Sequence, residues 1–238
     1  MITNNQIKYI RSLSLKKNRI KDQSFIVEGE KSVLELLESS YQILKLFATH
    51  DWCEKKYNVD INRISNKDLS RVSFLKSPNK VLAIVKKPLL KKISNKGTTL
   101  VLDQITDPGN LGTIIRLSDW FNVQNIICSP NTVDCYNPKV VQATMGSIFR
   151  VNILYTDLVE YLSSIKQPIY GSFIEGNNLK SIKFPKSFHM ILGNESKGIS
   201  SDLMKFVTKK VTIFPVTEQR DSLNVATATA IMLYATTI

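Results

Sequence analysis

Hydrophobic positions in the second part of the chain form short continuous runs, separated by segments with helical spacing. Runs rich in β-branched residues and leucine are typical of strands that are buried on both faces of a parallel sheet. The runs lie at Thr98–Leu102, Val123–Cys128, Val151–Leu154, Pro168–Tyr170, Phe188–Leu192 and Val211–Phe214. Because helical segments alternate with them, the pattern predicts an α/β domain with a mostly parallel sheet over residues 98–238.

The first part of the chain has a different and more polar pattern. Ile7, Ile10 and Leu13 recur at three-residue spacing, which predicts one short amphipathic helix within residues 4–21. The segments that follow are predicted as strand 24–27, helix 33–37, strand 41–48, helix 67–74 and strand 81–85. These elements indicate a small α/β domain over residues 1–90. The basic stretch Lys86–Gly97, which contains Pro88 and ends in glycine, indicates a linker, which we place at residues 91–97.

The positive charge is concentrated in this first part. The chain has 32 Lys and Arg against 20 Asp and Glu, a net charge of +12, and residues 1–97 hold 20 of the basic but only 9 of the acidic residues. Such an imbalance favours a module that binds a polyanion, joined to a domain with another task. A solvated basic surface that only keeps the protein soluble is the alternative, and charge alone does not decide between them.

Composition excludes several other classes of protein. With 238 residues, 43% of them hydrophobic, the chain reads as globular rather than disordered. It has no run of 18 apolar residues and no secretory signal at its start, which predicts a cytoplasmic protein. Cys53, Cys128 and Cys135 form no metal-binding pattern with His50 and His189, so we expect inert thiols and no metal.

The first segment with candidate chemistry is residues 103–121, DQITDPGNLGTIIRLSDWF. Asp107-Pro108 predicts a helix start, with Asp107 as the N-cap. Arg116 stands in an apolar run of that helix, where a permanent cation needs a partner or a function. An ion pair with Asp119 or Asp103 and a functional role are both open at this point.

Two further segments carry polar groups at strand ends. In ILGNESKGIS, a buried strand leads into a loop bracketed by Gly193 and Gly198 with Glu195 between them, and such loops bind ligands in open α/β sheets. After the strand ending in FPV, Ser222 is placed to cap a final helix over residues 225–234. That helix is apolar nearly all round, so it is buried in its own domain or against another subunit.

No common nucleotide-binding or hydrolase motif is present. The sequence contains no G-x-G-x-x-G after a strand, no phosphate loop ending in Gly-Lys-Ser/Thr and no G-x-S-x-G nucleophile elbow.

Three motifs together nevertheless resemble one family. DPGNLGTIIR, ILGNESKGIS and FPVTEQRDSLNVATATAIMLY resemble, in order, the motifs of the SpoU (TrmH) family of RNA ribose 2'-O-methyltransferases, and LVLD and KVVQATMGSIFRV also fit. The front part, with KYIRSL and KKNRIKDQSFIVEGEKSVLELLES, resembles the substrate-binding domain that often precedes this catalytic domain. The resemblance covers nearly the whole chain.

The resemblance implies a fold, a cofactor and partners. It implies a trefoil-knotted α/β domain preceded by a small ribosomal-protein-like α/β domain, a knot being an exception among protein folds. It also implies S-adenosylmethionine bound at the knot, an RNA substrate, and a homodimer whose active site draws on both subunits.

The resemblance also assigns site residues. The catalytic residues it implies are Arg116, Asn110, Glu195, Ser222 and Asn224. The cofactor-binding residues it implies are Leu192, Gly193, Asn194, Ile213, Phe214, Pro215, Ser222, Leu223 and Asn224. Glu218 and Val216 stand where the family usually has glycine and methionine, so the backbone of that loop is expected to differ.

The mechanism we expect gives Arg116 an electrostatic role. A guanidinium with a pKa above about 12 is a poor proton acceptor. Our hypothesis is that Arg116 holds the adjacent phosphate or the developing alkoxide, oriented by Asn110 and Glu195. The separate front domain favours 23S ribosomal RNA as the substrate, with a transfer-RNA 2'-O-methyltransferase and a non-catalytic RNA-binding or ribosome-assembly protein as alternatives.

Overall fold

The computed structural model describes residues 2–52, 59–89, 92–94, 96–216 and 222–237. The chain forms two compact units. The first unit is Met1–Leu89 with Asp134–Arg150, and the second is Leu90–Val133 with Val151–Ile238. Residues 134–150, which we expected in the second domain, therefore pack with the first.

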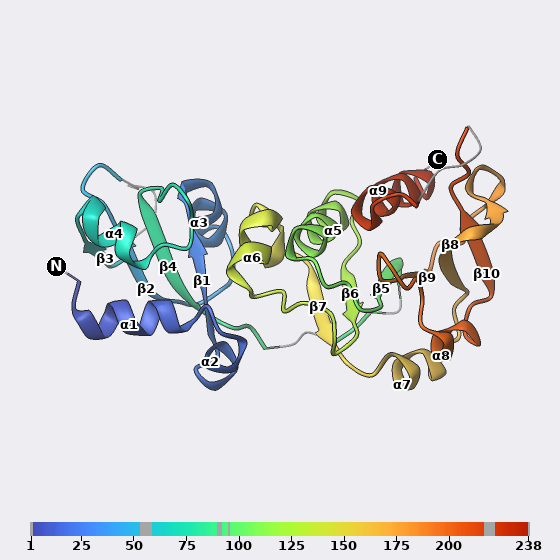
Figure 1. Cartoon of the computed structure of the whole chain (residues 1–238), viewed down its shortest axis with the longest axis horizontal. Coiled ribbons are helices and arrows are strands. Elements are labelled where there is room, and N and C mark those ends of the chain that lie inside the picture. Colours follow the sequence, from blue (N-terminus) through green and yellow to red (C-terminus); the bar gives the residue numbers. More distant parts are fainter. Residues whose placement is uncertain (1, 53–58, 90–91, 95, 217–221, 238) are drawn as a thin grey trace. The chain divides into compact units, whose positions relative to one another are not determined.

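The first unit is built on a four-stranded sheet (Figure 1). Its strands, in order across the sheet, are β1 (Ser24–Glu28), β4 (Val81–Lys86), β2 (Ile43–Ala48) and β3 (Ile61–Arg63). β4 is antiparallel to both of its neighbours, and β2 is parallel to β3. The helices of this unit are α1 (Asn4–Ser12), α2 (Lys16–Lys21), α3 (Glu30–Leu37), α4 (Asn66–Val72) and α6 (Pro138–Thr144), with the short 3-10 helix η1 (Ser147–Phe149).

The start of the chain contains the short amphipathic helix predicted within residues 4–21, and a second short helix, α2, follows it. α1 begins at a capping box made by Thr3 and Gln6, and the chain leaves the helix at Leu13 before α2 starts. At this break, Ser14 Oγ donates to the carbonyl of Arg11 at 2.8 Å, a local bond that competes with helix continuation. Ile7, Ile10 and Leu13 are buried as their spacing predicts.

Residues 134–150 are joined to the first unit by a buried ion pair. Arg19 is 1% exposed, and its Nε and Nη2 donate to Asp134 Oδ2 at 2.9 and 2.6 Å. Its Nη1 donates to the carbonyls of Leu13 and Ser14, both at 2.7 Å. The guanidinium is thus paired and hydrogen-bonded at the same time, which is the condition under which a buried charge is tolerated.

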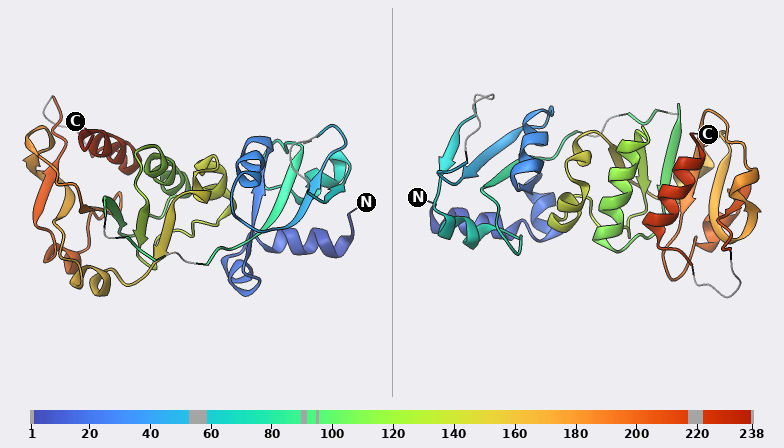
Figure 2. Two further views of the ribbon diagram at one scale, coloured as in Figure 1. Left: turned by 180° about the vertical axis from the view of Figure 1, so that it is seen from behind. Right: turned by 90° about the horizontal axis from the view of Figure 1, so that it is seen from above.

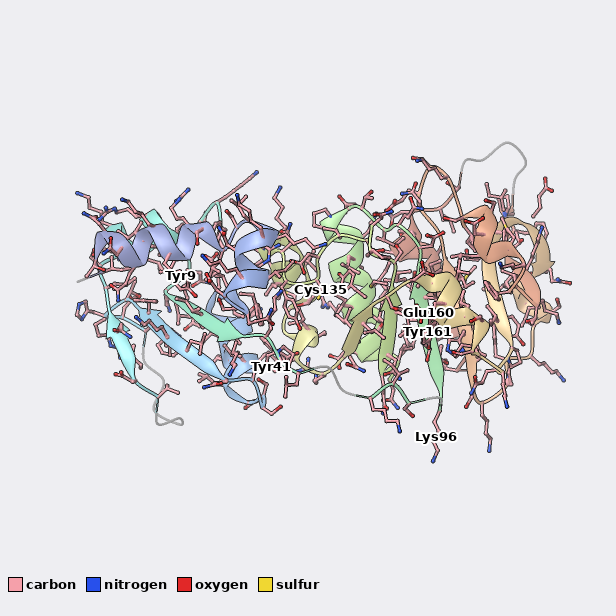
Figure 3. All side chains as sticks on the ribbon, turned by 90° about the horizontal axis from the view of Figure 1, so that it is seen from below. Tyr9, Tyr41, Lys96, Cys135, Glu160 and Tyr161 are labelled. Atoms are coloured by element: carbon pink, nitrogen blue, oxygen red, sulfur yellow. The ribbon has the colours of Figure 1, made fainter. Side chains whose placement is uncertain are left out.

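Aromatic packing, and the contact of α6 with an edge strand of the sheet, also hold residues 134–150 to the rest of the first unit. The rings of Phe25 and Tyr136 lie 4.5 Å apart, and those of Tyr41 and Phe149 lie 5.1 Å apart. Burial raises the pKa of Tyr41, labelled in Figure 3, to about 12, so it stays a neutral donor to the carbonyl of Ile148. α6 packs on β1, an edge strand of the sheet, and so covers an edge that would otherwise be open to pairing.

The second unit contains a six-stranded sheet in which every pairing is parallel. Its strands, in order across the sheet, are β10 (Lys209–Thr212), β8 (Ile169–Asn178), β9 (Phe188–Leu192), β5 (Thr98–Leu102), β6 (Asn125–Cys128) and β7 (Asn152–Tyr155). All six predicted strands are present. β8 is longer than its prediction, and β10 starts and ends two residues earlier than predicted.

Helices cover both faces of this sheet (Figure 2). α5 (Pro108–Trp120) and α9 (Val225–Ala235) lie side by side on one face. α7 (Leu158–Ser163) and α8 (Ser201–Met204) lie on the other, with the 3-10 helix η2 (Leu179–Ser181) after β8. This alternation confirms the predicted α/β class. The predicted knot includes residues 217–221, which lie outside the described residues, so the knot stays a prediction.

Two further expectations concern thiols and membranes. Cys128 and Cys135 are buried, and Cys53 lies outside the described residues. Within the described ranges, no group of His, Cys, Asp and Glu is arranged to hold a metal ion. The same ranges contain no helix of the length and apolarity needed to span a bilayer.

Candidate active site

The candidate site is built where two central strands of the second unit end. β5 and β9 are paired so that Leu102 lies opposite Leu192, and the backbone N–H of Asp103 donates to the carbonyl of Leu192 at 2.9 Å. The loops after these strands therefore start side by side, at the sheet edge where open parallel sheets bind ligands. α5 follows the first loop, with Asp107 as its N-cap and Pro108 in its first turn, as predicted.

One polar residue from each of the three motifs joins a single hydrogen-bonded chain. Asn110 Nδ2 donates to Glu195 Oε1 at 2.6 Å, and Asn224 Nδ2 donates to Asn110 Oδ1 at 2.9 Å. Asn110 is 85 positions from Glu195 and 114 from Asn224 in sequence; Glu195 and Asn224 are exposed, and Asn110 is half-buried. The amide of Asn110 is fixed in orientation, because one of its neighbours can only accept and the other donates.

Asn224 has a second task as the N-cap of α9. Its Oδ1 accepts from the backbone N–H groups of Ala226 and Thr227 at 2.9 and 3.2 Å. The expectation that Ser222 caps this helix is wrong, because the helix starts at Val225 and the cap falls on the residue directly before it. Ser222 is exposed in the loop that precedes the cap.

Arg116 lies on the exposed side of α5 and has no carboxylate partner among the described residues. Asp103, one of the two partners considered from the sequence, is 3% exposed and accepts from the backbone N–H of Ser200 at 2.7 Å. The ion-pair interpretation of Arg116 is therefore wrong. The expected contact of Asn110 and Glu195 with Arg116 is also absent from the described chain, since these two residues bond each other.

The helix that carries Arg116 is otherwise held by apolar packing. The four positions expected to pack on the sheet are all buried: Leu111, Ile114, Ile115 and Ser118. The guanidinium of Arg116 consequently sits on a rigid helix while remaining open to an anionic ligand, which a flexible loop would not provide.

The loop after β9 is shaped by its own residues. A Cβ on Gly193 would lie 2.3 Å from the carbonyl carbon of Gly198, so only glycine fits there. The side chain of Asn194 accepts from Ser196 N and Lys197 N at 3.0 and 3.1 Å, and donates to the carbonyl of Gln104 at 2.8 Å. Asn194, expected to bind cofactor, thus has its side chain occupied in holding the loop.

The remaining residues expected to bind the cofactor differ in exposure, since one is buried in the core and others are exposed in loops. The side chain of Leu192 is fully buried in the core, so only its backbone faces the site. Phe214 and Leu223 are 52% and 48% exposed, an unusual exposure for apolar side chains at the end of a sheet. Exposed apolar side chains suit the flat adenine ring of S-adenosylmethionine, and Leu223 directly precedes Asn224 of the hydrogen-bonded chain. Ile213 and Pro215 flank Phe214.

A network of hydrogen bonds behind this loop supports it and has no separate signal in the sequence. Gln104 adopts a left-handed conformation with φ 55°, its backbone N–H donates to Ser129 Oγ at 2.9 Å, and its Nε2 donates to Ser200 Oγ at 3.1 Å. The position of Gln104 directly after a buried strand was the available clue. Val216 is exposed, and Glu218 lies outside the described residues.

Comparison with known proteins identifies the class. Residues 97–234 match the model of the SpoU rRNA Methylase family, and residues 4–83 match the model of the MRM3-like substrate binding domain. A 23S rRNA (guanosine(2553)-2'-O)-methyltransferase from Bacillus subtilis is 29% identical over 97% of this chain and 95% of its own.

Solved structures agree with this assignment. A protein of the TrmH family from Porphyromonas gingivalis superposes with a TM-score of 0.90 at 33% identity, over 99% of this chain and 98% of that one. An AdoMet-bound rRNA methyltransferase from Sinorhizobium meliloti gives a TM-score of 0.87 at 28% identity, over 99% and 95% of the two chains.

The site and the parallel sheet thus define an RNA methyltransferase that uses S-adenosylmethionine. The chain belongs to the SpoU rRNA methylase family, with a substrate-binding domain at its start. The predicted family, fold class, enzyme class and cofactor are confirmed. The individual roles of the site residues and the domain limits at 90 and 98 stay predictions.

Proposed function

We propose that this chain transfers a methyl group from S-adenosylmethionine to a ribose 2'-hydroxyl of 23S ribosomal RNA. The observation that carries the proposal is the hydrogen-bonded chain of Asn110, Glu195 and Asn224, which unites one residue from each family motif, with the exposed Leu223 directly before Asn224. The relative from Bacillus subtilis supports the substrate, because the similarity extends over both parts of the chain.

Arg116 and Asn110 can take different roles in methyl transfer to the ribose hydroxyl. The sulfonium of the cofactor makes its methyl carbon electrophilic without a metal. Arg116, which has no partner of its own in the described chain, binds a phosphate or the alkoxide that develops on the ribose, because a guanidinium stabilises negative charge but is a poor base. Asn110, held between Glu195 and Asn224, positions the ribose hydroxyl, whose proton leaves to phosphate or water.

We further propose that the active site is completed in a homodimer. Trp120 on α5 is 81% exposed, and Tyr234 on α9 is 59% exposed. α5 and α9 pack side by side, so both helices present large apolar side chains at the surface of the second unit. A second copy of the chain would cover them, and Arg116 lies one helical turn before Trp120, where it can reach a partner's site.

The first unit supplies affinity for RNA. This unit, residues 1–89 with 134–150, holds 19 Lys and Arg against 10 Asp and Glu, and phosphate contacts by Lys and Arg release counterions. Binding of RNA should therefore weaken steeply as salt is raised, while binding of S-adenosylmethionine should change little.

The test is methyl transfer from labelled S-adenosylmethionine to unmodified 23S ribosomal RNA and, separately, to unmodified transfer RNA. Label on a ribose of 23S RNA is the expected result. Label only on transfer RNA would keep the reaction and overturn the substrate. If the protein binds S-adenosylmethionine but methylates neither naked RNA, the same assay is repeated with a ribosomal assembly intermediate as the substrate. Absence of methyl transfer to that intermediate too would favour a non-catalytic RNA-binding protein.

A further inference from the structure

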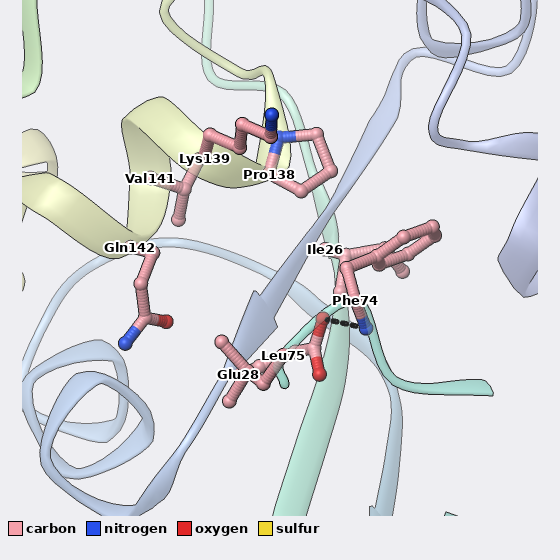
Figure 4. Close-up of a pocket in the computed structure, with 8 residues that line it drawn as sticks. All are labelled: Ile26, Glu28, Phe74, Leu75, Pro138, Lys139, Val141 and Gln142. Atoms are coloured by element: carbon pink, nitrogen blue, oxygen red, sulfur yellow. Dashed lines mark hydrogen bonds between the residues drawn. The ribbon is translucent and has the colours of Figure 1, made fainter. Parts of the chain in front are cut away.

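A cavity of about 250 Å³ lies inside the first unit, apart from the residues of the candidate active site (Figure 4). Three segments line it: the end of β1, the loop after α4 and the first two turns of α6. All three belong to the same compact unit, although α6 comes from the part of the chain that matches the methyltransferase family. The cavity therefore exists only because α6 packs beside β1.

The acidic group in the wall of the cavity is the buried carboxylate of Glu28. Glu28 is 7% exposed, its Oε2 accepts from Ser73 Oγ at 2.5 Å, and its Oε1 accepts from the backbone N–H of Phe74 at 2.9 Å. Burial raises the pKa of Glu28, while these two bonds oppose that rise. Within the described chain, no Lys or Arg forms an ion pair with it.

Glu28 can accept further hydrogen bonds. A carboxylate has about four acceptor positions, and the neighbouring groups occupy two of them. A ligand that fills the cavity must therefore offer N–H donors to Glu28. A ligand with an acceptor at this place would leave the carboxylate oxygens buried against it without a hydrogen bond.

The other walls favour a flat ligand. Ile26, Leu75, Pro138 and Val141 are apolar, and Phe74 contributes an aromatic ring. Unpaired RNA bases are bound in this way, by packing against aromatic and apolar side chains and by hydrogen bonds along the Watson–Crick edge. The exposed cation Lys139, at the start of α6, is available for a phosphate beside the base.

The carboxylate also selects among the bases. Guanine presents two adjacent donors, N1–H and the N2 amino group, which match the two oxygens of a carboxylate. Uracil presents one N–H between two carbonyl acceptors, and adenine and cytosine place a ring acceptor beside their amino group. Guanine is therefore the base whose donors best match the two oxygens of Glu28. The amide of Gln142 can in addition donate to O6 of guanine.

We propose that this cavity binds an unpaired guanine base of the substrate RNA, with Glu28 accepting from its N1–H and N2 amino group. The inference rests on the proposed function only in taking RNA as the substrate. It assigns to the first unit a sequence-reading site in addition to its general affinity for phosphates.

The test uses the full chain and three RNA pentamers, UUGUU, UUIUU and UUUUU. Inosine lacks only the N2 amino group of guanine, so it removes one of the two donors. A correct base contact is worth about 1–3 kcal/mol, so UUGUU should bind roughly tenfold more tightly than UUIUU and UUUUU. In methyl NMR spectra, UUGUU should shift the signals of Ile26, Leu75 and Val141. Equal affinities for the three pentamers would overturn the proposal.

Two variants separate the base contact from folding. Glu28→Gln replaces one acceptor by a donor and should abolish the preference, so that UUGUU and UUIUU bind with about equal affinity. Because Glu28 also holds Ser73 and Phe74, Gln142→Trp provides a second variant, which fills the cavity from α6 and leaves those bonds intact. Gln42→Trp, at an exposed position outside the cavity, is the matched control and should keep the preference.

These assays involve no methyl transfer. A preference for guanine that survives both variants would contradict the cavity proposal and leave the methyltransferase assay untouched. Failure of methyl transfer to 23S RNA, with the guanine preference intact, would contradict the proposed reaction alone.

Discussion

Two arginines, one in each unit, show how surroundings divide structural from chemical roles. Arg19 is 1% exposed and donates to one carboxylate and two carbonyls. Arg116 is exposed on a helix whose opposite side is buried, and it has no ion-pair partner among the described residues. The same side chain is therefore part of the fold in the first unit and free to bind an anion in the second.

The carboxylates follow the same division. Asp134 is 9% exposed and shares its Oδ2 between two nitrogens of Arg19. Glu195 is exposed and accepts from Asn110, with its second oxygen bonded to nothing that the structure describes. In this protein, polar groups that are buried and fully bonded hold segments together, whereas exposed ones at the strand ends form the site.

Removing Arg19 should give the largest loss of stability among the substitutions considered. Arg19→Leu leaves Asp134 as a buried, unpaired charge, which should destabilise the first unit by about 3–5 kcal/mol. Unfolding by urea, followed through the fluorescence of the buried Trp52, measures the loss. Arg11→Leu is the control, since Arg11 is exposed and should cost less than about 1 kcal/mol. Equal costs for the two variants would contradict the structural role of Arg19.

Removing Arg116 should have the opposite profile. Arg116→Ala should lower kcat by about 10²–10³-fold, as loss of a group that stabilises developing charge does. Stability and the Kd of S-adenosylmethionine should be nearly unchanged, and Lys166→Ala, at an exposed lysine outside the site, should leave kcat unchanged. Arg116→Lys with a near-full rate would argue against a two-point contact by the guanidinium.

The second unit contains a buried histidine that is only partly bonded, since its Nδ1 has no hydrogen-bond partner in the described part of the chain. His189 is 2% exposed, its Nε2 lies 2.9 Å from the hydroxyl of Tyr161, and burial lowers its pKa to about 4. The unfolded chain, with a histidine pKa near 6.5, binds the proton more strongly than the folded one. Stability is thus complete above about pH 6.5 and should fall by about 2–3 kcal/mol as the pH drops from 6.5 towards 4.

The control for this pH dependence is His189→Gln, whose side chain does not titrate. Thermal unfolding of this variant should show a smaller loss between pH 6.5 and 4 than the natural sequence does. Identical pH profiles would show that His189 is not the group responsible.

Asn224 should show the smallest loss among the residues expected to affect stability, and two substitutions separate its two roles. Asn224→Ala removes the cap of α9 and should cost about 1 kcal/mol. Asn224→Asp keeps an oxygen for the cap but cannot donate to Asn110, so it should preserve stability and still lower kcat. If the Asp variant kept both stability and kcat, the bond between Asn224 and Asn110 would have no part in the reaction.

Much of the second unit was predictable because its strands are buried on both faces. Continuous apolar runs mark such strands directly, and all six were found from them. Glu195 was recognisable because it lies in the loop directly after such a run, whereas Asn110, which lies in α5, was assigned only by the resemblance to the family. The start of the last helix at residue 225 was predicted correctly, but its cap was placed at Ser222, two residues before the observed cap Asn224, because both are good cap residues.

The first unit held what the sequence could not show. Arg19 and Asp134 are 115 positions apart, and no periodicity links them, so the association of residues 134–150 with this unit was missed. The cavity beside Glu28 was missed for the same reason, since one wall comes from α6 and the others from the front of the chain. Short-range patterns predict elements, whereas such contacts depend on how distant segments pack.

The most direct test of the account compares the natural sequence with Arg116→Ala on unmodified 23S ribosomal RNA, with ribose methylation mapped nucleotide by nucleotide. The account predicts a 2'-O-methyl group at a defined position with the natural sequence, and none above background with a variant that remains folded and binds S-adenosylmethionine. Methylation by the variant at the natural rate would contradict the claim that the free guanidinium of Arg116 carries the chemistry.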